Sequence, residues 1–121
     1  MADQDGPEGG RRAIAELLNT GFQPTAVICV NDFTAIGVLR ELRDRGLRVP
    51  HDVSVTGFDN IQLSEFCYPA LTTVHIPRDR IGHLVFQALV PDPAQGAVPG
   101  REVVVESKLI LRDSVGPAGV S

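Results

Sequence analysis

The sequence lacks tryptophan and has only two cysteines, Cys29 and Cys67, among its 121 residues. Two cysteines, one of them inside an apolar run, do not form the disulfide framework of small secreted domains, so we expect both thiols to be reduced. No apolar run approaches the ~20 residues needed to cross a bilayer, and the polar start at Met1 lacks the basic and apolar regions of a signal peptide. We therefore expect a cytoplasmic protein that does not contact a membrane.

Positive charge is scarce as well. Lysine and arginine total 11 against 15 aspartates and glutamates, which gives a net charge of −4 at pH 7. Binding to a nucleic-acid backbone requires a basic cluster, and the sequence contains none. The proportions of hydrophobic residues (43%) and charged residues (21%) are those of an ordinary globular protein, and the length fits one domain. We therefore expect one folded domain that does not bind DNA by itself.

Sequence motifs for catalysis, metals or cofactors are missing too. The three histidines, His51, His75 and His83, fall on a predicted loop, strand and helix. Their spacing does not fit a zinc site, and none stands beside a nucleophile as its base. The glycines near the start precede a predicted helix, whereas a phosphate-binding loop connects a strand to a helix. We therefore predict that the protein is not an enzyme and has no catalytic residue, no metal and no cofactor.

The hydrophobic pattern of the first half alternates between the periods of helices and strands, which is typical of an α/β fold. Residues 9–20 form a predicted helix, and residues 26–30 form a continuous apolar strand that we expect to be buried on both faces. A helix follows over residues 32–46, with Asp32 as its N-cap, and an alternating strand over residues 53–58. Strand, helix and strand make a βαβ unit, whose two strands are parallel.

The second half continues with shorter elements. The pattern predicts a single helical turn at 63–66, an extended segment at 71–76, a helix at 78–90 with a buried apolar stripe, a surface loop at 91–100 and a last strand at 102–112. From Ser114 onward we expect a frayed tail. The phenylalanines Phe22, Phe33 and Phe66 are expected in the core, because large apolar side chains are mostly buried.

Polar side chains end both strands of the predicted βαβ unit. Asn31 and Asp32 follow the first strand, and Asp59 and Asn60 follow the second. Because parallel strands finish at the same edge, the four side chains should converge in the crevice where open α/β sheets bind ligands. Two other interpretations stay open from the residues alone. The first pair could simply end a strand and cap a helix, and the second could simply form a turn.

Several segments, in register along most of residues 9 to 114, carry a resemblance to a known family. They are Pro24-Thr-Ala-Val-Ile-Cys-Val-Asn-Asp with Ala35-Ile-Gly, Gly46-Leu-Arg-Val-Pro, Asp52-Val-Ser-Val-Thr-Gly-Phe-Asp-Asn, Pro69-Ala-Leu-Thr-Thr-Val-His-Ile-Pro-Arg with Ile81-Gly, and Leu109-Ile-Leu-Arg-Asp-Ser. Together they resemble the sensor domain of the lactose/galactose repressor (LacI/GalR) family of transcriptional regulators.

The resemblance implies a parallel-sheet, periplasmic-binding-protein-like (type I) domain of two lobes, with a small-molecule effector bound between them. Family members also carry an N-terminal helix-turn-helix that reads an operator. Residues 1–121 look like about the second half of the sensor, mainly its C-terminal lobe, and residues 71–90 resemble the segment that crosses back to the N-terminal lobe. Residues 115–121 would be a disordered tail. A crossing strand and helix without their home sheet favour self-association, so we expect a homodimer.

The resemblance also assigns roles at the strand ends. It implies that Asp59 and Asn31 contact the effector, that Asn60 helps, and that Asp32 caps the helix beside the site. An ionised carboxylate that accepts two donors in a closed cleft provides specificity through direction. A sugar is the first candidate for the effector and a nucleobase the second. The family often places a contacting residue ahead of the first helix, where this sequence has Asp5-Gly-Pro, so stacking on a ring is unsupported.

Two further functions remain open beside a regulator that binds DNA only through a helix-turn-helix outside this sequence. One is a periplasmic-type sugar-binding protein of a transport system, which shares the two-lobed fold. The other is a stand-alone interaction module without a ligand. The segments beginning at Leu71 and Leu109 look more like the repressor branch. We therefore predict a regulator in which the effector shifts a closure equilibrium and thereby operator binding.

Overall fold

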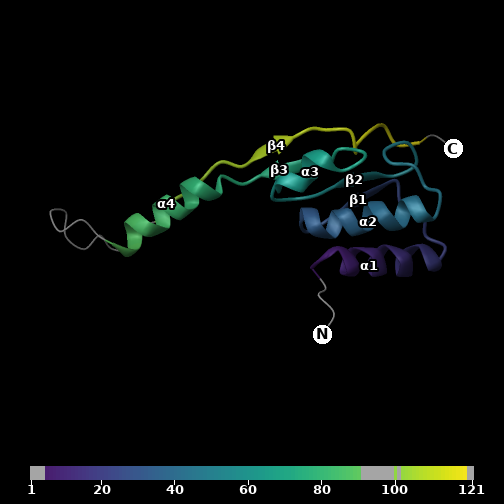
Figure 1. The fold of residues 1–121 in the computed structure, drawn as a ribbon, viewed down its shortest axis with the longest axis horizontal. Helices are drawn as coiled ribbons and strands as arrows, with labels where there is room; N and C mark the ends of the chain where they lie inside the picture. The colour runs from purple at the N-terminus through teal and green to yellow at the C-terminus, as the bar shows by residue number, and fades with distance from the viewer. Residues whose placement is uncertain (1–4, 91–99, 101, 120–121) are drawn as a thin grey trace. The chain divides into compact units, whose positions relative to one another are not determined.

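The computed structural model describes residues 5–90, 100 and 102–119. In chain order the elements are α1 (Pro7–Asn19), β1 (Ala26–Ile28), α2 (Asp32–Asp44), β2 (Ser54–Thr56), α3 (Gln62–Phe66), β3 (Thr73–His75), α4 (Arg78–Leu89) and β4 (Lys108–Ile110), as labelled in Figure 1. The chain divides into two compact units, Met1–His75 with Leu109–Ser121, and Ile76–Lys108. We call them the larger and the smaller unit. No described helix is both long and apolar enough to cross a bilayer.

The two long helices of the larger unit pack directly on each other (Figure 1). α1 begins at Pro7, two residues earlier than predicted, because proline is well suited to the first helical position. Glycines allow the close approach of the helices. A Cβ atom at Gly10 would collide with the carbonyl oxygen of Thr34, and one at Gly37 would collide with that of Pro7. α1 ends before Gly21, whose φ of 88° is a conformation that glycine adopts without strain.

β1 and β2 are parallel, as predicted, with Val27 opposite Val55 in the register. The expectation that the first strand is buried on both faces is wrong, because Ile28 is 86% exposed and Val30 is 68% exposed. Within the described residues β1 pairs with β2 and with no other strand, so it is an edge strand. The neighbouring Val55 of β2 is fully buried. The apolar run therefore identified a strand but not its place in the sheet.

The core of the larger unit is aliphatic. Its members come from α1, α2, β2 and the segments around them, and they are Ile14, Cys29, Ala35, Val38, Leu39, Leu42, Val53, Val55 and Leu71. The expectation that Phe22, Phe33 and Phe66 lie in this core is wrong, because all three are exposed. Mostly branched aliphatic side chains occupy the core, and the three phenylalanine rings lie at the surface.

The predicted helix of the smaller unit is present as α4, but its predicted buried stripe is wrong. No residue of α4 is buried, and Leu89 is 76% exposed. Between Ile76 and Ser107, the described residues hold no second helix or strand on which α4 could pack. The loop predicted at 91–100 lies outside the described residues except for Gly100.

The last strand is shorter than the predicted 102–112, since β4 covers only Lys108–Ile110, where it pairs with β3. The expectation of a frayed tail is wrong at Ser114 and Gly116. Ser114 is fully buried, and its carbonyl oxygen accepts a hydrogen bond from the backbone nitrogen of Val55 at 2.9 Å. The backbone nitrogen of Gly116 donates to the hydroxyl of Ser54 at 3.1 Å. The segment after β4 is therefore fastened to β2.

Candidate functional site

The ends of the two parallel strands meet, as the sequence predicts. The backbone nitrogen of Asp32 donates to the carbonyl oxygen of Phe58 at 3.0 Å, which joins the start of α2 to the end of the second strand. The backbone nitrogen of Asp59 donates to the carbonyl oxygen of Val74 at 2.9 Å, which adds β3 to the same edge. We call the resulting group, Asn31, Asp32, Asp59 and Asn60, the strand-end site.

Asp32 is fully buried beneath this site. Its Oδ1 accepts the hydroxyl of Thr73 at 2.6 Å, and its Oδ2 accepts the backbone nitrogen of Ile61 at 2.8 Å. A Cβ atom at position 57 would collide with this carboxylate, so Gly57 is needed there. The side chain thus joins α2, β3 and the loop after β2. A buried carboxylate with its oxygens satisfied inside the protein is structural.

The predicted cap by Asp32 is wrong, because Asn31 is the N-cap of α2. Asn31 has an extended backbone, and its Oδ1 accepts the backbone nitrogen of Thr34 at 2.8 Å. Asp32 is already the first helical residue, so its side chain is not placed to take that position. The cap also fixes the amide of Asn31, because the atom that faces a backbone N–H must be the oxygen. Its NH₂ group then remains as a donor on the other side.

Asp59 and Asn60 both have positive φ angles, 115° and 54°. Aspartate and asparagine are among the few side chains that tolerate this region, and two such residues in succession require support from neighbours. Part of that support comes from β3, where the hydroxyl of Thr73 accepts the backbone nitrogen of Asn60 at 3.2 Å. The left-handed turn therefore sets the direction in which the side chain of Asp59 leaves the backbone.

The side chain of Asn60 is held at both ends by residues of the same unit. Its Oδ1 accepts Nη2 of Arg112 at 2.8 Å and the hydroxyl of Ser64 at 3.2 Å. Its Nδ2 lies 3.0 Å from Nδ1 of His75. The role of Asn60 as an effector contact stays a prediction, as do the roles of Asp59 and Asn31. The hydrogen bonds place Asn60 in the wall of the site.

Sequence reasoning missed Arg112 and Thr73 as members of this network. Arg112 reaches Asn60 from 52 positions further along the chain, and Thr73 reaches Asp32 from 41 positions. Periodicity describes neighbours within one element and gives no sign of such contacts. The available signal was that both residues lie in the segments that resemble the LacI/GalR family, at 69–78 and 109–114.

The surroundings of both cysteines disfavour the thiolate form. Burial raises the pKa of Cys29 to about 12, and the negative charge of Asp32 adds to the effect. Burial also raises the pKa of Cys67, with a further increase from Asp32 and an opposing effect from Arg112. In the structure both cysteines are free, Cys29 buried and Cys67 partly buried. Among the described residues no group of three His, Cys, Asp or Glu side chains could hold a metal ion.

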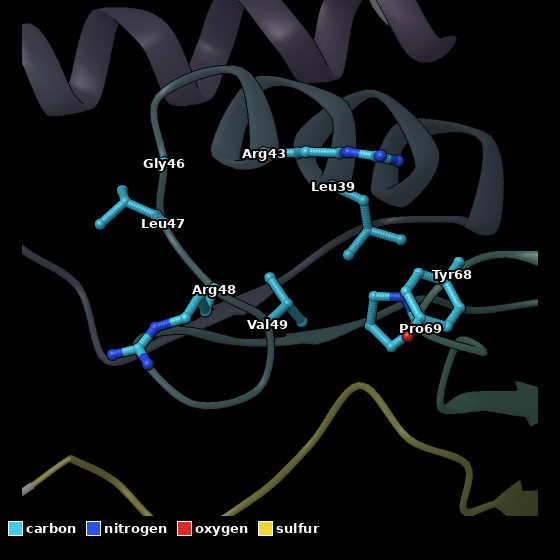
Figure 2. A pocket seen from close by; sticks show the side chains of 8 residues that line it. All are labelled: Leu39, Arg43, Gly46, Leu47, Arg48, Val49, Tyr68 and Pro69. Carbon is cyan, nitrogen blue, oxygen red and sulfur yellow. The ribbon is translucent and has the colours of Figure 1, made fainter.

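A pocket of about 300 Å³ lies elsewhere in the larger unit. It is lined by Leu39 and Arg43 of α2, by residues 46–49 after that helix, and by Tyr68 and Pro69 after α3 (Figure 2). None of these residues belongs to the strand-end site. The pocket is mainly apolar, and Tyr68 at its rim is 91% exposed. It has no buried polar group that would orient a small ligand, so we assign the candidate binding role to the strand-end site.

Comparison with known proteins identifies the family. Residues 1–115 match the family model of the periplasmic binding protein-like domain. The HTH-type transcriptional repressor PurR of Salmonella arizonae is 39% identical over 109 residues, and that of Proteus mirabilis is 38% identical. In each case the match covers 90% of this chain and 32% of the relative. The chain thus spans about a third of the length of the curated relatives that it matches.

Solved structures agree with the sequence match. A putative LacI regulator from Bacillus cereus subsp. cytotoxis has a TM-score of 0.86 and 31% identity, and the match covers 93% of this chain and 40% of that one. The lac repressor dimer bound to operator and the anti-inducer ONPF has a TM-score of 0.84 and 29% identity, with 91% and 38% covered. The predicted fold class, a parallel-sheet, periplasmic-binding-protein-like α/β domain represented in part, is confirmed. The chain therefore belongs to the periplasmic binding protein-like domain family and corresponds to a part of the effector domain of a LacI/GalR regulator.

Proposed function

We propose that this chain is the ligand-sensing part of a DNA-binding transcriptional regulator and that a small-molecule effector contacts Asn31 and Asp59. The observation that carries the proposal is the convergence of these residues at the edge where Asp32 bonds to Phe58. Ligands of open α/β sheets bind at this edge. The curated relatives are named as HTH-type transcriptional repressors, which supports regulation of transcription over transport or catalysis.

The chemistry of the two side chains favours a polyhydroxylated effector. The side-chain amide of Asn31 caps α2 through its oxygen and offers its NH₂ group as a donor. An ionised carboxylate at Asp59 accepts hydroxyl or N–H groups. A sugar provides both partners on adjacent carbons, so a sugar is the first candidate and a nucleobase the second. Two LacI-family structures support this order, one from Enterococcus faecalis with bound ribose and one from Arthrobacter sp. FB24 in complex with lactose.

In this proposal the effector closes two lobes, of which residues 1–121 supply mainly one. Residues 71–90 would cross to the other lobe, which agrees with the separate compact unit formed by residues 76–108. Contact with an operator is assigned to a helix-turn-helix outside this sequence, because the net charge of −4 does not suit DNA binding. Closure would then change the spacing of two DNA-binding heads.

We also propose that the regulator is a homodimer. Two structural relatives are described as a lac repressor dimer and as a dimeric lac repressor. In this chain Tyr68, which lines the pocket at Leu39, and Phe66, two positions before it, both expose large rings, and a second copy would bury them. Sedimentation equilibrium measures the mass directly, and a monomer at micromolar concentration would contradict this part of the proposal.

The test uses the longest natural form of the protein that contains these residues. Its melting temperature is measured with a panel of pentoses, hexoses, disaccharides and nucleobases, and operator binding is measured by gel shift with DNA from upstream of its own gene. We expect one class of compound to raise the melting temperature and to change the gel shift. No response to any panel member, together with no operator binding, would contradict the proposal.

Variants locate the site. Asp59→Ala should abolish the response to the active panel compound and leave operator binding intact. Asn31→Ala should weaken the response less, because a neutral hydrogen bond contributes only about 0.5 to 1.5 kcal/mol. The matched control is Asp113→Ala, which removes an exposed carboxylate outside the strand-end site. Loss of operator binding in Asp59→Ala with normal effector affinity would contradict the assignment.

A further inference from the structure

The guanidinium of Arg112 donates hydrogen bonds to three residues of the larger unit. Nη2 donates to Oδ1 of Asn60 at 2.8 Å, and Nη1 donates to the hydroxyl of Ser64 at 2.8 Å and to the carbonyl oxygen of Leu71 at 3.0 Å. Its backbone nitrogen donates to the hydroxyl of Thr72 at 2.9 Å. A planar guanidinium loses little freedom per hydrogen bond, so it fixes its partners in one geometry.

This arrangement sets the direction of the next hydrogen bond. Arginine is charged at every accessible pH and has donors only, so the atom of Asn60 that faces Arg112 must be the oxygen. The NH₂ group of Asn60 then faces Nδ1 of His75 at 3.0 Å. Nδ1 must therefore be an acceptor, and the hydrogen of the neutral ring resides on Nε2. The donors of Arg112 thus select the tautomer of His75 through the amide of Asn60.

The hydrogen bond from Arg112 to the side chain of Asn60 also supports the turn that carries Asp59. The backbone nitrogen of Asn60 donates to Thr73, whose hydroxyl in turn donates to Asp32. The main chain of Asn60 is therefore held by Thr73, and its side chain is held by Arg112, Ser64 and His75. Both anchors are needed because Asp59 and Asn60 occupy φ angles of 115° and 54°, which cost energy in side chains other than glycine.

We propose that Arg112 is a positioning residue of the strand-end site. Through the amide of Asn60 it holds the left-handed turn that aims Asp59 and keeps His75 as an acceptor at Nδ1. The role of Arg112 in effector affinity rests on the proposed function, whereas its control of His75 rests on the hydrogen bonds alone.

The first test needs no effector. Nitrogen NMR of the histidine rings is recorded on the longest natural form of the protein at about pH 8, above the ordinary titration range of imidazole. We expect His75 to show an unprotonated acceptor at Nδ1 and a hydrogen on Nε2. In Arg112→Met the ring should become a mixture of tautomers, and Arg112→Lys should restore part of the native pattern. An unchanged His75 pattern in Arg112→Met would overturn the proposal.

Arg45→Met is the matched control for loss of an arginine. Arg45 also donates to an amide oxygen, that of Asn19 at 3.0 Å, and to Glu41 at 3.0 Å, but it lies at the C-terminal end of α2. We expect its removal to leave the tautomer of His75 unchanged. The same loss of pattern in Arg45→Met and Arg112→Met would mean general loosening of the unit and would overturn the specific role of Arg112.

A second variant keeps the arginine and avoids the risk that its removal unfolds the unit. In Asn60→Asp the side chain still pairs with Arg112 but has only acceptors. The atom that faces Nδ1 of His75 is then an oxygen, so we expect the hydrogen of the ring to move from Nε2 to Nδ1. Retention of the native tautomer in Asn60→Asp would show that Asn60 does not control His75, which would overturn the proposal.

The effector arm uses the panel compound that raises the wild-type melting temperature most. Its dissociation constant should rise about 10-fold to 100-fold in Arg112→Met, the range for loss of a hydrogen bond from a charged donor. The control Arg45→Met should bind as the wild type does. An unchanged dissociation constant in Arg112→Met would overturn the positioning role. Failure of every panel compound with the wild type would contradict the proposed function instead, and the NMR measurements would still decide whether Arg112 controls His75.

Discussion

The helices α2 and α4 are nearly equal in length, with 13 and 12 residues, and both carry apolar side chains at helical spacing. Six residues of α2 are buried, and none of α4 is. α2 packs against α1 and β2 within the larger unit, whereas α4 has no partner element among the described residues of the smaller unit. The apolar period therefore specifies a helix and its apolar face, but that face is buried only where another part of the protein packs against it.

The largest difference between the two helices should appear in the free energy of unfolding when one leucine in each is replaced by alanine. Leu42 of α2 is fully buried, with a relative exposure of 0%, whereas Leu89 of α4 is 76% exposed. In the 121-residue chain, Leu42→Ala should lower the free energy of unfolding by about 2 to 5 kcal/mol, because it leaves a cavity. Leu89→Ala should change it by about 0.5 kcal/mol or less. Urea unfolding measures both, and equal losses would show that α4 is packed after all.

The next effect comes from the aspartate in the first turn of each helix, Asp32 in α2 and Asp79 in α4. Asp32→Asn replaces one acceptor oxygen by a donor, so either the hydroxyl hydrogen of Thr73 or the backbone N–H of Ile61 loses its acceptor. We expect a loss of about 1 to 3 kcal/mol in the free energy of unfolding. Asp79→Asn, at an exposed position, should lie within about 0.5 kcal/mol of the wild type. Thermal unfolding compares the two, and a neutral Asp32→Asn would contradict the structural role of the carboxylate.

A smaller difference should come from the start of the helices, since α2 has a side-chain cap and α4 has none. Asn31→Ala removes the bond to Thr34 and should cost about 1 kcal/mol of stability. Asn31→Asp keeps an acceptor at the cap and should restore most of it. Urea midpoints of the three proteins provide the measurement. If Asn31→Asp were as unstable as Asn31→Ala, the cap would not be the cause.

The smallest effect is expected from the exposed pair of Arg48 and Asp52, in the turn that leads into β2. Hydrogen bonds from Arg48 lower the pKa of Asp52 from 3.8 to about 2. A lowered pKa in the folded state stabilises the protein above the unfolded value, and this contribution is lost as the pH falls from about 4 to about 2. Melting temperatures of wild type and Asp52→Asn should therefore converge across this range. Parallel curves would show that the pair does not contribute to stability.

Most of the fold followed from local pattern. The apolar period placed α1, α2 and α4, and the alternation of elements predicted the parallel pair β1 and β2. Burial did not follow in the same way. The apolar pattern predicted that the segments of Ile28 and Leu89 are buried, yet both side chains are exposed. Burial depends on which other elements are present to cover them.

The candidate site could likewise be predicted from the sequence only in part. The sequence brought Asn31 and Asp32 to the same edge as Asp59 and Asn60, because the ends of parallel strands coincide. It did not predict that Asn31 caps α2 while Asp32 is buried, since either residue type suits a cap. It also gave no sign of Arg112, whose contact with Asn60 is made between distant parts of the chain.

The sequence by itself therefore determined the alternation of elements, the parallel βαβ unit, the edge where the polar side chains gather and the family. These depend on periodicity, on strand direction and on short segments, all of which are local in the chain. Only the tertiary structure decided the cap of α2, the buried carboxylate of Asp32 and the hydrogen bonds from Arg112 through Asn60 to His75. Those depend on packing, because a hydrogen bond needs two groups within about 3 Å and only the folded chain brings distant residues that close.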